Sequence, residues 1–142
     1  MLLGDIETQM TADQIIVRDK VELARVSAYG RSPSDMKVLP MIHVVALITA
    51  QPGQLAAVLA AFRENMPAVH AEAGCIAYQP VVDTPDVGAF QAKIGPDSFI
   101  VLETWESADA LRAHAAAPHM AEYGRKVKGM LANRTIHVLS PA

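Results

Sequence analysis

Cysteine is almost absent from the sequence, since Cys75 is the only one in 142 residues. A single thiol excludes an intrachain disulfide and any metal site that needs several cysteines. We therefore expect a reducing, cytoplasmic setting. Cys75 itself is expected to be structural rather than nucleophilic, because free cysteines in proteins are commonly buried.

Basic charge, aromatic residues and long apolar runs are also scarce. The net charge is −3 and aromatic residues make up 5% of the chain, which disfavours phosphate neutralisation and base stacking. The most apolar run, "VVALITA" at 44–50, is far shorter than the roughly 20 residues that cross a bilayer. Asp5 and Glu7 interrupt the region that would be apolar in a signal peptide. We expect no nucleic-acid partner, no membrane partner and no secretion.

Several motifs of catalysis and cofactor binding are missing as well. The chain has no G-x-G-x-x-G, no P-loop and no G-x-S-x-G. Their absence disfavours a dinucleotide or nucleoside triphosphate held in the usual loop, and also the serine nucleophile of an α/β-hydrolase. The sequence gives no reason to expect a cofactor.

Charge divides the chain at about residue 40. Eleven of the 27 charged residues lie in the first 40 positions, and Pro40 closes this polar segment. The remaining residues follow a regular apolar pattern, and hydrophobic residues make up 51% of the whole chain. We expect residues 1–40 to form an N-terminal arm or extension and residues 41–142 to form one folded domain.

The folded part predicts alternating strands and helices. Strands are expected over about 42–50, 75–82, 98–105 and 134–139, with a brief one in "FQAKI" at 90–94. An apolar stripe predicts a helix from Leu55 that stops before Pro67. Ser107 can cap a second helix, which Pro118 divides. This order predicts an α+β, ferredoxin-like split βαβ fold with helices on one sheet face.

Both faces of two central strands are apolar. In the strand at 42–50, one face carries only apolar residues, and the opposite face carries Val45 and Leu47 beside His43. Helices cover only one face of so small a sheet, and an open apolar face of several strands exceeds what monomers usually expose. We therefore expect a homodimer that packs sheet on sheet.

Two histidines, His114 and His119, flank Pro118 shortly after the only tryptophan. They lie five residues apart across a proline, whereas zinc helices usually place ligands four apart on one helix, so we expect no metal site. Exposed helix ends without a task, or polar parts of a ligand pocket, are the other two interpretations. The pocket is favoured because Glu103 and Trp105 share a strand face over which the next helix must fold.

Three further residues are candidates for the same pocket, each with an ordinary structural alternative. Asn65 either caps the end of its helix or donates a hydrogen bond to a ligand. His43 either faces the cavity or has no task at an edge. Tyr123 lies four residues after His119 on one helix face, and its ring either packs in the core or offers a phenol to the ligand.

The stretch from about Ile42 to Leu139 resembles the antibiotic biosynthesis monooxygenase family. The matching segments are "PGQ" at 52–54, "FREN" at 62–65, "EAGC" at 72–75, "ETWES" at 103–107 and "AHAAAPHMAEY" at 113–123. This family of small dimeric α/β-barrel proteins includes quinol monooxygenases, polyketide-anthrone monooxygenases and the isomerase that degrades phosphorylated autoinducer-2. The resemblance implies a dimer whose two sheets close into a barrel.

The resemblance also implies roles for particular residues. Asn65, Trp105, His114 and His119 would surround a cavity between helices and sheet, with Glu103 in support. A histidine would accept a proton, Asn65 would donate to an oxyanion and Trp105 would form a wall. A deprotonated quinol or anthrone would itself supply the electron to O₂, without metal or flavin. Haem is not implied, because the axial histidine of haem-degrading relatives falls near Gly124.

We therefore expect a cofactor-independent monooxygenase that oxidises a small quinol or phenol with O₂. One alternative is an isomerase or degradation enzyme for a small phosphorylated dicarbonyl, with phosphate bound near Arg63 or Arg112. Another is a non-catalytic dimer that binds a metabolite. The fold hosts many chemistries, so the sequence leaves the three open.

Overall fold

The computed structural model describes residues 41–142, so the arm expected at residues 1–40 lies outside the described residues. The elements follow the expected order of strand, helix, strand, strand, divided helix and strand. They are β1 (Ile42–Ala50), α2 (Leu55–His70), β2 (Cys75–Val81), β3 (Ser98–Trp105), α3 (Ala108–Ala116), α4 (Pro118–Val127), a 3-10 turn (Lys128–Met130) and β4 (Leu131–Leu139).

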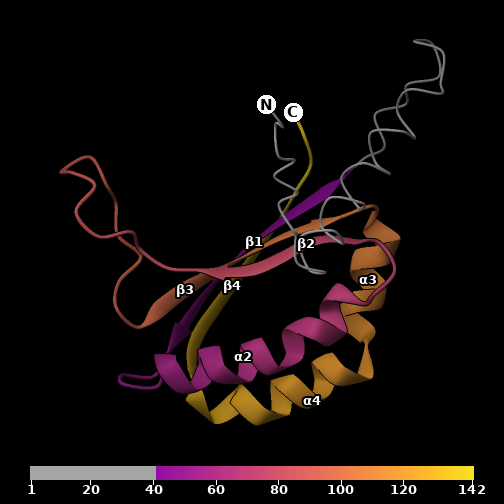
Figure 1. The fold of residues 1–142 in the computed structure, drawn as a ribbon, viewed down its shortest axis with the longest axis horizontal. Helices are drawn as coiled ribbons and strands as arrows, with labels where there is room; N and C mark the ends of the chain where they lie inside the picture. Colours follow the sequence, from indigo (N-terminus) through magenta and orange to yellow (C-terminus); the bar gives the residue numbers. More distant parts are fainter. Residues whose placement is uncertain (1–40) are drawn as a thin grey trace, which may run out of the picture. The chain divides into compact units, whose positions relative to one another are not determined.

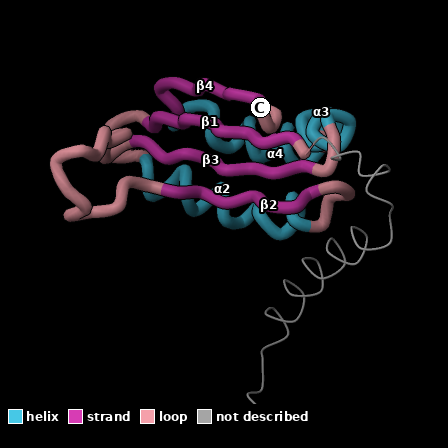
Figure 2. The backbone as a smooth tube through the Cα atoms, turned by 90° about the horizontal axis from the view of Figure 1, so that it is seen from above, coloured by secondary structure: helices cyan, strands magenta, loops and turns pink. Residues whose placement is uncertain are grey.

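The four strands form one antiparallel sheet in the order β2-β3-β1-β4 (Figure 2). The helices lie on one face of this sheet, where α2 and α4 run side by side (Figure 1). This arrangement is the α+β ferredoxin-like fold that the sequence predicts. No helix among residues 41–142 is long and apolar enough to span a membrane.

The core lies between the sheet and the helices. Every second residue of β1, from Ile42 to Ala50, is buried, while the residues between them are half-buried. The register pairs Ile42 with Trp105 and Val44 with Glu103, so the buried side of β1 continues into β3. The alternation predicted for both strands is confirmed, and it places Glu103 and Trp105 on the helix side of the sheet.

The divided helix has local causes at both ends. The Ser107 side chain accepts a hydrogen bond of 3.1 Å from the Ala110 N–H, which caps α3. Ala117 is extended (φ −64°, ψ 137°), because the residue before a proline avoids helical conformation. Pro118 then occupies the first turn of α4, where its missing N–H costs nothing.

Two details of the sequence prediction are wrong. Helix α2 does not stop before Pro67 but continues to His70. Its last turn contains Val69, which is fully buried, so core packing outweighs the local cost of the proline.

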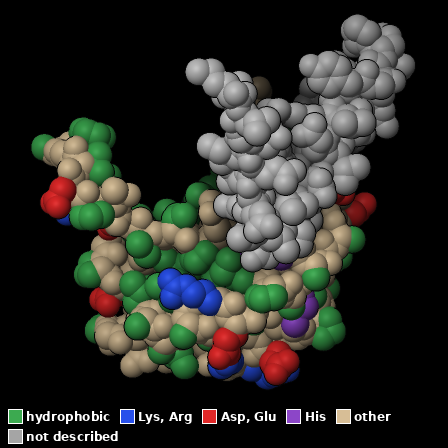
Figure 3. Space-filling view, viewed as in Figure 1, with side chains coloured by type: hydrophobic (Ala, Val, Ile, Leu, Met, Phe, Trp, Pro, Cys, Tyr) green, Lys and Arg blue, Asp and Glu red, His purple; other side chains and the backbone are tan. Residues whose placement is uncertain are grey.

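The segment "FQAKI" forms no strand, because its backbone is engaged elsewhere. Both carboxylate oxygens of Asp83 accept hydrogen bonds of 3.0 Å, one from the Ile94 N–H and one from the Gly95 N–H. These two bonds lower the pKa of the Asp83 carboxyl and close the base of a projecting loop at 82–97. Hydrophobic side chains lie on this projection (Figure 3). Phe90, within the loop, is exposed.

Candidate functional site

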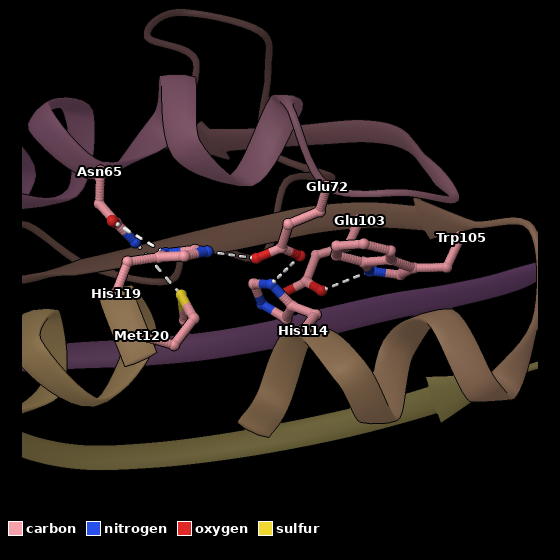
Figure 4. A network of polar contacts seen from close by, with 7 residues as sticks. All are labelled: Asn65, Glu72, Glu103, Trp105, His114, His119 and Met120. Atoms are coloured by element: carbon pink, nitrogen blue, oxygen red, sulfur yellow. Dashed lines mark hydrogen bonds and ion pairs between the residues drawn. The ribbon is translucent and has the colours of Figure 1, made fainter. Parts of the chain in front are cut away.

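A network of polar side chains joins the two helices of the divided segment to α2 and the sheet (Figure 4). It contains the four residues that the family resemblance places around a cavity, together with Glu103. Two additional members are Glu72 and Met120. The network is Asn65, Glu72, Glu103, Trp105, His114, His119 and Met120.

His114 lies at the end of α3 and is buried, with 6% of its side chain exposed. Its Nδ1 lies 2.9 Å from Oε2 of Glu72. Its ring lies against the Trp105 indole, with ring centres 4.6 Å apart, and near the Tyr78 ring at 5.5 Å. The carboxylate and the two aromatic rings hold this imidazole in one orientation, so it is not a surface residue.

His119, in the first turn of α4, contacts two other elements. Its Nδ1 lies 3.1 Å from Oδ1 of Asn65, and its Nε2 lies 2.5 Å from Oε1 of Glu72. This second contact is short but poorly directed for a hydrogen bond, although both atoms are buried. The His119 side chain is 27% exposed, compared with 6% for His114. His119 is therefore the more accessible of the two imidazoles.

Asn65 does not cap a helix, because it lies inside α2 rather than at its end and its side chain points toward α4. Its Nδ2 donates to the sulfur of Met120 over 3.2 Å, while its Oδ1 faces His119. The structure therefore brings Asn65 and His119 together.

Glu72 reaches both histidines because of a tight turn before β2. Gly74 has a φ of +83°, a backbone conformation that residues other than glycine rarely adopt. A Cβ atom at Gly74 would lie 2.6 Å from that of Ala110, so only glycine lets the turn pack this closely against α3. The Glu106 N–H also donates to the Gly74 carbonyl over 2.9 Å. These contacts place Glu72 beside the end of α3.

Glu103 accepts a hydrogen bond of 2.8 Å from the Trp105 indole. Burial raises the pKa of the Glu103 carboxyl, and the nearby Glu72 carboxylate raises it further. The Trp105 hydrogen bond, and His114 when its ring carries a second proton, act in the opposite direction without cancelling the effect of burial. Glu103 therefore keeps its proton to higher pH than an exposed glutamate.

We predict that Glu103 makes the protein less stable as pH rises. In the folded state Glu103 keeps its proton at pH values above about 4.3, where an unfolded glutamate loses it. The folded state is therefore favoured at low pH, and this advantage is lost as pH rises through the folded-state pKa of Glu103. Glu103→Gln should lose less stability than the wild type between about pH 4 and about pH 7, because the substituted amide carries no charge and still accepts from the indole. Urea unfolding at both pH values measures this. Glu122→Gln, at an exposed position, is the control, and an equal pH dependence in all three proteins would contradict the prediction.

Aromatic side chains form the wall between this network and the core. Phe62 stacks on Tyr78 with ring centres 5.0 Å apart and meets Tyr123 edge-on at 6.1 Å. Burial raises the pKa of Tyr123 to about 12 and that of Tyr78 still further. Both phenols therefore stay protonated at neutral pH. The core packing of Tyr123 agrees with the structural alternative, and its ring contacts Phe62 rather than the histidines.

His43 is not part of the network. Its ring nitrogen lies 3.2 Å from the Thr104 hydroxyl, and the two residues pair across β1 and β3. Both lie on the sheet face away from the helices, whereas Glu103 and Trp105 lie on the helix face. The expectation that His43 shares a cavity with Glu103 is therefore not matched by the register of the strands.

A hollow of about 510 Å³ lies elsewhere, between the start of α2 and the base of the 82–97 loop. Leu55, Leu59, Val82 and Lys93 are among its lining residues, and none of the lining residues belongs to the network. Within residues 41–142, no three or more His, Cys, Asp or Glu side chains are grouped so as to hold a metal ion.

Sequence reasoning missed Glu72 as a site residue. The only signal was its place in "EAGC", where a glycine that must turn the chain follows a charged residue. Tyr78, the aromatic neighbour of His114, was also missed, because the pattern of β2 is equally that of an ordinary core strand.

A ferredoxin-like sheet whose helix face carries a histidine–carboxylate network against a buried tryptophan defines a small α+β protein with a polar site between its layers. The family model for antibiotic biosynthesis monooxygenase matches residues 41–126. The chain belongs to this family.

Individual relatives agree with the family assignment. The chain is 41% identical over 103 residues to the protein named probable quinol monooxygenase YgiN of Escherichia coli K12, an alignment that covers 71% of this chain and 98% of YgiN. Among solved structures, PA3566 of Pseudomonas aeruginosa is 27% identical with a TM-score of 0.60, over 72% of this chain and 95% of that one. Rv0793 of Mycobacterium tuberculosis, at 22% identity, shares the fold with a TM-score of 0.59 over 72% and 95% of the two chains.

Proposed function

We propose that this protein is a monooxygenase that oxidises a small quinol or phenol with O₂. Family membership and the similarity to YgiN support the reaction class. The observation that carries the assignment to this site is His119, a partly exposed imidazole held by Asn65 and Glu72 beside a buried aromatic wall. Proton transfer and anion stabilisation are the tasks that such groups perform.

The proposed reaction balances without an external reductant. A quinol and O₂ give a hydroxyquinone and water: one oxygen atom forms the new C–O bond, and the other leaves as water with two hydrogens of the substrate. The quinol must first lose a proton, because the quinolate gives up an electron to O₂ more readily. The network would hold that proton and the anion, and the Trp105 and Tyr78 rings, which pack against His114, form its apolar side.

The charges of the network favour a quinol over a phosphorylated dicarbonyl. Among residues 41–142, the ion pairs of Glu72 are with histidine alone, and no Lys or Arg joins them. Arg112 instead pairs with Asp109 on the surface of α3, with 75% of its side chain exposed. Arg63 is exposed as well. Within this part of the chain, no Lys or Arg forms an ion pair with a residue of the network, so a phosphate group bound at His119 would have no Lys or Arg already held in place for it, as phosphate sites usually have.

Oxygen uptake with a panel of quinols and phenols tests the proposed function. We expect uptake above the rate of autoxidation, and ¹⁸O₂ labelling should place one O₂-derived oxygen in the product. A protein that consumes no oxygen with any member of the panel, but rearranges a phosphorylated dicarbonyl, would contradict the proposal.

We also propose that the protein acts as a homodimer that packs sheet on sheet. The face away from the helices carries Val45, Leu47, Ile100 and Leu102, and β4 is exposed along almost its whole length. An uncovered apolar surface of this extent favours a second copy.

Leu102→Glu is expected to convert the dimer to a monomer, because it would bury a charge at the contact between the sheets. Light scattering coupled to size-exclusion chromatography measures the mass. Ala57→Glu adds the same charge to an exposed position of α2 and should leave the dimer intact. A wild-type protein with the mass of one chain would contradict the homodimer.

A further inference from the structure

The carboxylate of Glu72 lies between the two imidazoles of the network. Oε2 faces His114 and Oε1 faces His119, and the Glu72 side chain is only 16% exposed. Among residues 41–142, its ion pairs include no Lys or Arg. A buried carboxylate is stable only with a counter-charge or several donors, so the two imidazoles must meet this need.

The donors and acceptors around His119 determine where its protons are. Met120 offers Asn65 a thioether sulfur, which can only accept, so the Asn65 NH₂ faces the sulfur and its carbonyl oxygen faces His119. His119 Nδ1 must then carry a proton that it donates to Asn65. Nε2 approaches a Glu72 oxygen at 2.5 Å in a buried contact, which two unprotonated atoms would not sustain. Both ring nitrogens of His119 therefore face acceptors.

His114 differs from His119 in this respect. Its Nδ1 donates to Glu72, so one proton on Nδ1 satisfies the contact. The neutral ring then has its lone pair on Nε2. The other groups near this ring are Trp105, Tyr78 and Glu103. Among residues 41–142, none of them accepts a hydrogen bond from Nε2 of His114, so no contact requires a second proton on this ring.

We propose that Glu72 is a positioning residue that keeps His119 doubly protonated and His114 neutral with its proton on Nδ1. In the proposed reaction, His119 then stabilises the quinolate and the reduced oxygen by its charge, and His114 is the imidazole that can accept the proton of the quinol. This division of roles rests on the proposed function, whereas the protonation states do not.

Nitrogen-15 NMR of the histidine rings tests the proposal without any substrate. In the wild type near neutral pH, both ring nitrogens of His119 should have the shifts of protonated nitrogens, and His114 should show one protonated and one unprotonated nitrogen. His114→Gln and His119→Gln assign the signals. A neutral His119 in the wild-type spectrum would overturn the proposal.

Two substitutions at Glu72 sharpen the test. Glu72→Gln keeps the size of the side chain but removes the charge, so His119 should lose the doubly protonated signal. Glu72→Asp keeps the charge and should retain that signal at least in part. Glu64→Gln removes an exposed carboxylate of α2 that pairs with Lys126, and it should leave both rings unchanged. Unchanged rings in Glu72→Gln would also overturn the proposal.

The kinetic consequence separates this proposal from the quinol assignment. If the panel gives oxygen uptake, Glu72→Gln should lower kcat more than it changes KM and should alter the pH profile, and Glu72→Asp should restore part of the rate. Expected ring spectra without oxygen uptake would contradict the quinol assignment alone. Oxygen uptake with a neutral wild-type His119 would contradict the Glu72 proposal alone.

Discussion

Replacing His119 by alanine is expected to lower kcat/KM for the quinol by about 10²–10³-fold, the usual effect of removing one preorganised donor to a developing anion. The substitution removes the cationic partner of Glu72 and the donor that faces Asn65. Most of the loss should appear in kcat, because the anion forms after the substrate binds. Oxygen uptake at several quinol concentrations measures both constants.

His70→Ala provides the matched control for His119→Ala. His70 is also a helix-end imidazole, but it lies in the last turn of α2, and its Nε2 contacts the Tyr78 carbonyl over 2.8 Å. Its removal should leave kcat/KM within a few-fold of the wild type, provided that His70→Ala and the wild type have similar melting temperatures. Normal turnover in His119→Ala would remove this histidine from the mechanism.

The side-chain positions that the sequence anticipates depend on short-range periodicity. Alternation along β3 places Glu103 and Trp105 on one face, whatever the other strands do. The cap at Ser107 and the break at Pro118 fix where α3 starts and ends, and this brings His114 back over that face. These features involve neighbours in sequence, for which local rules are reliable.

The parts that sequence reasoning missed depend on pairing between distant segments. His43 alternates with buried residues, but only the register of β1 with β3 decides which face it shares with Glu103. Glu72 meets His114 across 42 positions of sequence, through a turn whose close approach depends on Gly74. Pro67 remains inside α2 because the buried Val69 outweighs a local preference. Each of these outcomes follows from tertiary packing, which residue patterns alone do not specify.

Replacing Phe62 by alanine is expected to lower the free energy of unfolding by about 3–5 kcal/mol. The Phe62 ring is 2% exposed and touches three other aromatic rings, of Tyr78, Phe99 and Tyr123. Truncation removes these contacts and leaves a cavity that the sheet and α2 can fill only in part. Because Tyr78 also borders His114, the loss should disturb the site as well as the core.

Phe90→Ala makes the same chemical change at a residue that is 84% exposed on the 82–97 loop. It should alter the stability by no more than about 0.5 kcal/mol, since an exposed ring loses little on truncation. Urea unfolding of both variants, followed by the fluorescence of the single tryptophan, gives the two free energies under one set of conditions. Similar losses in the free energy of unfolding for the two variants would contradict the placement of Phe62 at the centre of the core. They would also mean that the aromatic wall does not stabilise the fold.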